Sequence, residues 1–132
     1  MRGYYLGTDI VELERIKKIH EKHGENFINK VYTPEERAHI SSLRSPTSFL
    51  SGRWAAKEAI YKLLATELNA GVAWQEIDIG KSESGAPVVT LKGKAKEIAE
   101  RKNIGPITLS ISHCRNYAVA YAMAEGEKVD VC

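Results

Sequence analysis

The sequence predicts an α+β fold in which antiparallel strands pack with a long central helix. Two pairs of short β-like segments, each pair separated by a polar turn, indicate the strands: 76–80 with 87–91, and 107–113 with 117–123. Residues 49–65 place their apolar side chains at helical spacing, which indicates the central helix. The elements do not follow the regular βαβ repeat of a parallel sheet, and this favours the α+β class.

A strand and a helix are expected to open the fold. Residues 4–8 (YYLGT) are typical of a short strand. From Ile10 to about His23 the apolar residues recur every three positions, which predicts a helix. Asp9 and Glu12 have the spacing of a capping box at the start of this helix, although Ser or Thr is the usual cap. Asp9 can serve as that cap and still keep a lone pair for a ligand.

The next helix begins at a clear signal. Thr33 caps it, Pro34 suits its first turn, and two acidic residues follow near the positive end of the helix dipole. This helix is expected to end near Leu43, and residues 45–48 form a loop or cap before the central helix. On a helical wheel the central helix has one apolar arc. Its members are Ala56, Ala59, Ile60, Leu63 and Leu64.

The C-terminal half is expected to hold two hairpins around a polar helix. The segment KSESGA joins the strands 76–80 and 87–91 as a hairpin turn. Residues 92–103 form the helix, which Asn103 and Gly105 end. The strands 107–113 and 117–123 alternate as half-buried strands do, with a turn at 114–116. One face of the last strand suits either the core or a subunit contact, and it carries Tyr117, Val119, Tyr121 and Met123.

Composition and charge exclude several classes of protein. The 132 residues suit a single domain, expected to span residues 1–132. A hydrophobic content of 43% argues against disorder, and a net charge of +2 is too small to indicate nucleic-acid binding. No apolar run reaches the roughly 20 residues that a membrane helix needs, and MRGYYLGTDIVEL lacks a signal-peptide core. A cytoplasmic protein without a membrane partner is therefore expected. Cys114 and Cys132 form no CxxC motif and are expected to be reduced thiols.

Two interpretations fit the acidic and basic residues of the central helix. Glu58 and Lys62 lie off the apolar arc at i, i+4 spacing, so they can form a solvated ion pair that contributes roughly 0.2–0.5 kcal/mol. Alternatively they belong to a metal and phosphate site. Magnesium takes one or two carboxylates and completes its shell with water and substrate phosphate. A second carboxylate is then needed, and Asp9 is the candidate.

The remaining charged residues give weaker signals. Arg15, Lys18 and Lys22 lie on one side of the first helix, where they form either a solvated face or a surface for an acidic partner. His113, at a strand end, suits a core or rim position as well as a catalytic one. No GxSxG or Walker-type motif is present. An enzyme of this sequence would therefore position two substrates rather than supply a nucleophile.

Two separated motifs resemble one enzyme family. GTDIVELERI fits the pattern G-x-D-[IV]-x-E-x-x-R-[IV], and FLSGRWAAKEAIYKLL contains K-E-A-x-x-K. Together with SESGAP and SISHCRNYAVAYA they resemble the holo-acyl-carrier-protein synthases, a small group of 4′-phosphopantetheinyl transferases. The resemblance covers nearly the whole chain. It implies a 4′-phosphopantetheinyl transferase-like fold and transfer of the 4′-phosphopantetheine arm of coenzyme A to a serine of apo acyl carrier protein, with release of adenosine 3′,5′-bisphosphate.

The resemblance also implies roles for individual residues. Asp9 and Glu58 match magnesium ligands, a place that manganese could also take because it favours the same oxygen ligands. Lys62 matches a lysine that contacts the transferred phosphate. As a hypothesis, Glu58 accepts the proton of the carrier serine, directly or through a metal-bound water. The coenzyme A contacts implied by the match are Arg53, Lys62, Gly85, Pro87 and His113.

The partners follow from the same resemblance. Arg15 matches an arginine that meets the acidic recognition helix of the carrier protein, and Lys18 and Lys22 extend that surface. Family members are homotrimers with active sites between neighbouring subunits. Two departures from the family pattern, ATELNAG after the central helix and Ala86 in the hairpin turn, put loop contacts to coenzyme A in doubt.

Two other functions remain open at this stage. A binding module with a basic helix would dock on an acidic protein and leave Glu58 and Lys62 as a plain ion pair. Another coenzyme A-dependent or phosphoryl-transfer enzyme would use the same magnesium site on a different acceptor.

Overall fold

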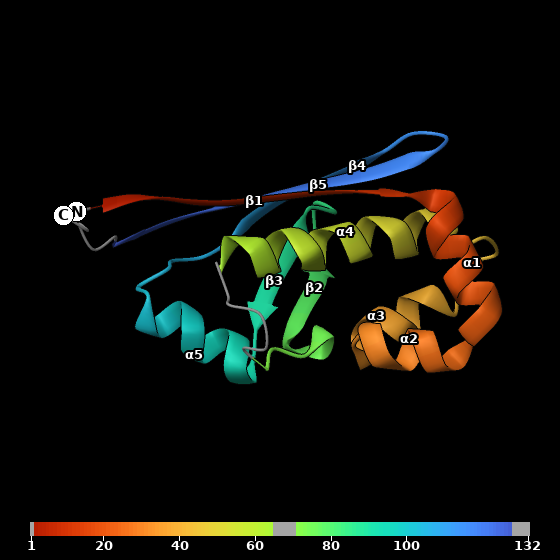
Figure 1. Cartoon of the computed structure of the whole chain (residues 1–132), viewed down its shortest axis with the longest axis horizontal. Coiled ribbons are helices and arrows are strands. Elements are labelled where there is room, and N and C mark those ends of the chain that lie inside the picture. Colours follow the sequence, from red (N-terminus) through yellow and green to blue (C-terminus); the bar gives the residue numbers. More distant parts are fainter. Residues whose placement is uncertain (1, 65–70, 128–132) are drawn as a thin grey trace.

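The computed structural model of the chain describes residues 2–64 and 71–127. A three-stranded antiparallel sheet lies over the long helix α4, a two-stranded hairpin lies beyond that helix, and three short helices gather at one end (Figure 1). The α+β architecture with a central helix is therefore confirmed. In chain order the elements are β1 (Arg2–Glu12), α1 (Leu13–His23), α2 (Glu25–Val31), α3 (Pro34–Ile40), α4 (Thr47–Leu63), the 3₁₀ helix η1 (Trp74–Glu76), β2 (Ile77–Lys81), β3 (Pro87–Leu91), α5 (Gly93–Arg101), β4 (Thr108–His113) and β5 (Tyr117–Glu127).

The core lies between α4 and the large sheet, whose strand order is β1-β5-β4. Small side chains let the two layers approach closely. On the helix-facing side of β5 every second residue is a buried alanine, from Ala118 to Ala124. Helix α4 also contributes buried alanines, namely Ala55, Ala56 and Ala59. Larger apolar residues of α1, α2 and α4 fill the space on the far side of the helix.

The start of the chain differs from the prediction. β1 runs to Glu12 because all of its residues pair with β5, from Arg2 opposite Glu127 to Glu12 opposite Tyr117. The helix therefore begins at Leu13, and Ile10 lies in the strand, 64% exposed. The capping box proposed for Asp9 is wrong, since Glu12 is the N-cap and forms no side-chain cap hydrogen bond. Long-range pairing outweighed the local helical spacing.

The other boundaries show where local signals were sufficient. The hairpin of β2 and β3 is confirmed, and so is the cap at Thr33, where Thr33 Oγ1 accepts from Glu36 N at 3.2 Å. Asn103, with a φ of 56°, follows the end of α5. Helix α2 was not predicted, and α3 ends at Ile40 rather than near Leu43. β5 is four residues longer than expected because β1 continues beside it.

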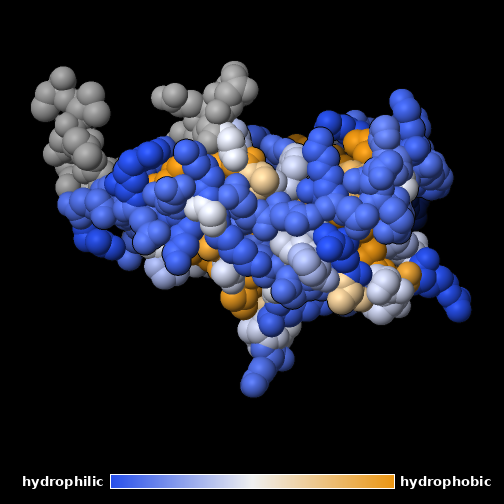
Figure 2. Space-filling view, turned by 90° about the horizontal axis from the view of Figure 1, so that it is seen from below, coloured by the Kyte–Doolittle hydropathy of each residue, from blue (hydrophilic) through white to orange (hydrophobic). Residues whose placement is uncertain are grey.

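The side of the large sheet that faces away from α4 is unusually apolar. Leu6 lies opposite Met123, and Ile10 lies opposite Val119, so these side chains share one face. We call this the open apolar face; its large residues, 38% to 64% exposed, are Tyr4, Leu6, Ile10, Tyr117, Val119, Tyr121 and Met123. By contrast, the side of the molecule away from the sheet is mostly hydrophilic (Figure 2). The last strand thus places its tyrosines outside the core of the chain.

None of the helices in the described part of the chain is long and apolar enough to cross a membrane. Cys114 is an exposed free thiol, and Cys132 lies outside the described residues.

A buried ion pair joins α4 to the elements beneath it. Lys57 Nζ lies 3.0 Å from Glu36 Oε1, and the two side chains are 0% and 1% exposed. Lys57 also donates to the carbonyl oxygens of Trp74 and Ile77. Glu36 accepts from the backbone N–H groups of Thr33 and Ile79, each at 2.8 Å. Burial lowers the pKa of Lys57, whereas the nearby Glu36 raises it. Both charges are therefore paired and hydrogen-bonded, as buried charges require.

We expect Lys57→Met to lower the free energy of unfolding by about 3–5 kcal/mol, because it leaves the buried Glu36 carboxylate without its cation. Urea unfolding followed by circular dichroism measures the change. Adding Glu36→Gln should recover part of the loss, because no buried charge then stays unpaired. Arg2→Gln, which breaks an exposed pair with Glu125, is the control and should change stability by less than about 1 kcal/mol. An equally small effect of Lys57→Met would contradict this account.

Candidate active site

Three of the predicted site residues come together where β1 crosses α4. Lys62 Nζ lies 3.1 Å from Asp9 Oδ1 and also donates to the backbone oxygen of Thr8 at 3.0 Å. Asp9 is half-buried on the face of β1 that packs on the helix. Glu58 lies one turn before Lys62 on α4. Lys62 therefore pairs with Asp9 on β1, and no direct ion pair with Glu58 is seen among the described residues.

Electrostatics link Glu58 to the same cluster. The pKa of Glu58 is raised above 4.5, first by burial and then by the negative charge of Asp9; the positive charges of Lys62 and Arg15 oppose this shift. These interactions require Asp9, Arg15 and Lys62 to lie near the Glu58 carboxylate. We call Asp9, Glu58 and Lys62 the carboxylate–lysine cluster.

The donor set of this cluster fits a divalent cation. Two carboxylates that repel one another offer the oxygen ligands that magnesium prefers, and magnesium needs only one or two of them when substrate phosphate completes its shell. No group of three or more His, Cys, Asp or Glu side chains that could hold a metal occurs in residues 2–64 and 71–127. A site with two carboxylates suits a cation that takes its remaining ligands from water or from a bound molecule.

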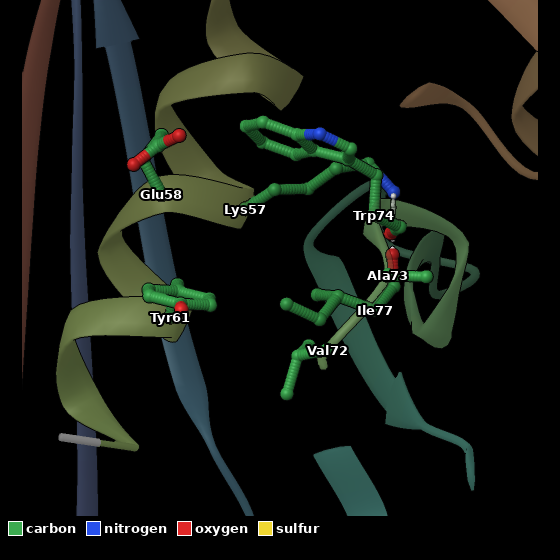
Figure 3. A pocket seen from close by; sticks show the side chains of 7 residues that line it. All are labelled: Lys57, Glu58, Tyr61, Val72, Ala73, Trp74 and Ile77. Carbon is green, nitrogen blue, oxygen red and sulfur yellow. Dashed lines mark hydrogen bonds between the residues drawn. The ribbon is translucent and has the colours of Figure 1, made fainter. Parts of the chain in front are cut away.

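Neighbouring residues of α4 point in different directions. Lys57 reaches toward Trp74, whereas Glu58 projects from the other side of the helix (Figure 3). Both residues nevertheless line one cavity of about 190 Å³. Its lining residues are Lys57, Glu58, Tyr61, Val72, Ala73, Trp74 and Ile77.

A second cavity collects the remaining residues that the sequence assigned to coenzyme A. Arg53, Gly85, Pro87 and His113 all line this space of about 440 Å³, together with Phe49, His39 and Lys81. The Arg53 guanidinium lies 4.6 Å from the ring centre of Phe49, and its Nε atom is buried without a hydrogen-bond partner. We call this the cationic cavity. It shares no lining residue with the cavity beside Glu58.

The basic residues of α1 form a third group. Arg15, Lys18 and Lys22 are all exposed, and the guanidinium of Arg15 lies 5.9 Å from the ring centre of Trp54. Trp54 stacks on Trp74 with ring centres 4.6 Å apart. Arg15 therefore contacts Trp54, and its positive charge also lowers the pKa of Glu58.

Sequence reasoning missed several residues of these sites. Lys57 was given no role, although its side chain is fully buried in an ion pair with Glu36. Lys81 and His39 reach the cationic cavity from β2 and α3 and had no motif that could mark them. Trp74 lay outside every predicted element. Of the two departures from the family pattern, Ala86 is exposed in the hairpin turn, and residues 65–70 of ATELNAG lie outside the described residues.

Comparison with known proteins identifies the family of this chain. Residues 5–122 match the family model of the 4′-phosphopantetheinyl transferase superfamily. The chain belongs to this superfamily. A holo-[acyl-carrier-protein] synthase of Caldanaerobacter subterraneus subsp. tengcongensis is 46% identical over 92% of the chain and 94% of that relative. The resemblance seen in the sequence is thus confirmed.

Solved structures of the superfamily share the fold. A holo-[acyl-carrier-protein] synthase from Neisseria meningitidis is similar with a TM-score of 0.83 and 32% identity over 90% of this chain and 95% of that one. The Helicobacter pylori synthase, solved in complex with coenzyme A, gives a TM-score of 0.78 and 30% identity over 90% and 98% of the two chains.

The raised pKa of Glu58 predicts how this residue affects stability. A carboxyl group with a higher pKa in the folded state binds more protons there, so stability falls as the pH rises from the unfolded-state pKa through the folded-state pKa. We expect Glu58→Gln to be more stable than the parent protein at neutral pH and equally stable below pH 4. Thermal unfolding in EDTA between pH 3.5 and 7.5 measures this. Glu100→Gln, on the exposed face of α5, is the control; parallel profiles for Glu58→Gln and the parent would contradict the prediction.

Proposed function

We propose that this protein transfers the 4′-phosphopantetheine group of coenzyme A to a serine of apo acyl carrier protein, releasing adenosine 3′,5′-bisphosphate. The main observation behind the proposal is that the side chains of Asp9, Glu58 and Lys62 lie close together where β1 crosses α4. Membership of the superfamily supports it, as do the names of the relatives, which are holo-[acyl-carrier-protein] synthases.

Within the carboxylate–lysine cluster, Asp9 and Glu58 would hold magnesium, or manganese in its place. When bound, the metal neutralises negative charge on the diphosphate that is attacked. Lys62 is long enough and exposed enough to leave Asp9 and donate to the transferred phosphate, since half of its side chain is open to solvent. Glu58 would also serve as the base that accepts the proton of the carrier serine. Phosphoryl transfer asks mainly for positioning and charge stabilisation, which these three side chains supply.

The cationic cavity is the proposed site of the nucleotide end of coenzyme A. Arg53, Lys81 and two histidines line it, so it suits an anionic ligand. The buried, unpartnered Nε of Arg53 leaves a donor available to such a ligand. Gly85 and Pro87 form its wall on the hairpin side. Phe49 gives it an apolar surface against which a flat ring can lie.

The exposed side of α1 is the proposed docking surface for the carrier protein. Arg15, Lys18 and Lys22 present positive charge on one helix, which suits an acidic helix of the partner. Arg15 also acts on the pKa of Glu58, so a carrier bound there would lie beside the carboxylate–lysine cluster.

A homotrimer with active sites at subunit interfaces is proposed as the functional assembly. None of Asp9, Glu58 and Lys62 lines the cationic cavity, so one chain offers two parts of a site in separate places. The open apolar face is the kind of surface that subunit contacts cover. One domain over residues 1–132 and a cytoplasmic location, expected from the sequence, stay predictions.

Mass spectrometry of an apo acyl carrier protein incubated with this protein, coenzyme A and magnesium tests the reaction directly. We expect a mass gain of one phosphopantetheine group. EDTA should abolish the gain, and Asp9→Asn should slow it at least about 100-fold, because a metal contributes several kcal/mol to such transition states. Consumption of coenzyme A without modification of the carrier would favour the alternative of a different acceptor. A binding module would consume none.

Subunit mixing tests the shared active site. Asp9→Ala and His113→Ala should each be inactive as pure proteins. Unfolded together in equal amounts and refolded, they should recover about a quarter of the parent activity, because random assembly of a ring brings one intact copy of each part together at about one site in four. Mixing without unfolding is the control. A monomer by light scattering, or no recovery after refolding, would contradict the proposal.

A further inference from the structure

The backbones of β1 and α4 approach each other closely at Gly7. A Cβ atom added to Gly7 would lie 1.9 Å from the backbone oxygen of Ala59 and 2.8 Å from the backbone nitrogen of Leu63. Gly7 is buried, and its main chain rests directly on one turn of the helix. Any side chain at this position would have to push the strand and the helix apart, because the atoms that it meets belong to the backbone and not to a flexible side chain.

This contact lies in the middle of the carboxylate–lysine cluster. Along β1, Asp9 follows Gly7 by two residues and therefore points to the same side of the strand. Along α4, Ala59 directly follows Glu58, and Leu63 directly follows Lys62. The contacting backbone atoms thus lie one residue from Glu58 and Lys62 and two residues from Asp9.

Small buried side chains surround this contact. Ala122 lies opposite Gly7 on β5, and Ala120 lies opposite Asp9; both are buried on the helix-facing side. These small side chains hold α4 close to β5. Because β1 lies in the same sheet, it can share this short distance from the helix only where it lacks a Cβ atom.

We propose that Gly7 is a positioning residue of the metal site: its missing side chain sets the separation of β1 and α4, and so the distance between the Asp9 and Glu58 carboxylates. The inference rests on the proposed function, in which these two carboxylates hold the metal. Gly7 contacts neither metal nor substrate itself. It acts through the backbones that carry Asp9, Glu58 and Lys62.

Gly7→Ala should therefore weaken metal binding in a protein that still folds. The contact must open from 1.9 Å to at least 3.0 Å, the shortest distance that real Cβ atoms keep. A displacement of about 1 Å can cost about 100-fold in rate, and loss of support for a metal ligand costs about 10- to 100-fold in affinity. We expect a loss of that size in Mn²⁺ affinity and a matching rise in the magnesium concentration needed for transfer.

The matched control is Gly126→Ala. Its Cβ would also meet backbone atoms, 2.7 Å from the oxygen of Asn103, but Gly126 pairs with Gly3 at the far end of the strands from Asp9. Both variants should lose stability in urea. Mn²⁺ binding, measured by electron paramagnetic resonance without coenzyme A or carrier, should fall for Gly7→Ala and Asp9→Ala and stay at the parent value for Gly126→Ala.

A rescue experiment separates positioning from general damage. If Gly7→Ala only moves Asp9 away, the longer carboxylate of Asp9→Glu should restore Mn²⁺ binding in the Gly7→Ala protein while weakening it in the parent. Should Gly7→Ala not fold, Ala122→Val replaces it, because it enlarges the same layer from β5 and should weaken Mn²⁺ binding equally.

The outcomes distinguish the two proposals. Parent-like Mn²⁺ binding in folded Gly7→Ala, or in Ala122→Val, overturns the role of Gly7, as does a parent protein that binds no Mn²⁺. Failure of the parent to modify an apo acyl carrier protein overturns the proposed function, and the Mn²⁺ result then still decides the role of Gly7.

Discussion

The buried ion pair between Lys57 and Glu36 fixes the rotation of α4 about its axis. This rotation decides which side chains of α4 face β1. Successive residues of a helix point about 100° apart. With Lys57 turned inward to Glu36, Trp74 and Ile77, Glu58 must turn toward β1, where Asp9 lies. The same pair joins α3, α4 and β2, so one interaction orients the helix and anchors it. A residue with no proposed chemical role thus decides where the acidic one points.

Two opposite requirements meet on this helix. Its far side carries Lys57, which reaches Glu36 of α3 and the backbone of η1 among larger apolar residues, whereas its sheet side carries small residues that let the backbones approach closely. The functional side chains occupy the border between these two sides. There they are partly desolvated, which raises the pKa of Glu58, and they still open to a substrate. Arg53, near the start of the same helix, faces another cavity, so α4 serves both parts of the proposed site.

The sequence predicted those features that depend on neighbours along the chain. The central helix, the cap at Thr33 and the hairpin of β2 and β3 each have a local cause, and all three are confirmed. The start of α1 was wrong because β5, more than a hundred residues away, extends β1 through Asp9 to Glu12. For the site, motif resemblance selected Asp9, Glu58 and Lys62, but spacing on the helix suggested a pair of Glu58 with Lys62. The actual partner of Lys62 lies on another element, and only the fold places it there.

Buried and exposed side chains alternate along β5, so the core and the open apolar face depend on the same strand. Alanines from Ala118 to Ala124 point to α4, and the residues between them, from Tyr117 to Met123, point outward. Because side chains in a strand alternate strictly, a shift of one residue in register would bring tyrosines against the helix and turn the alanines to solvent. Insertion or deletion of a single residue in this strand would therefore damage the core and the open apolar face at once.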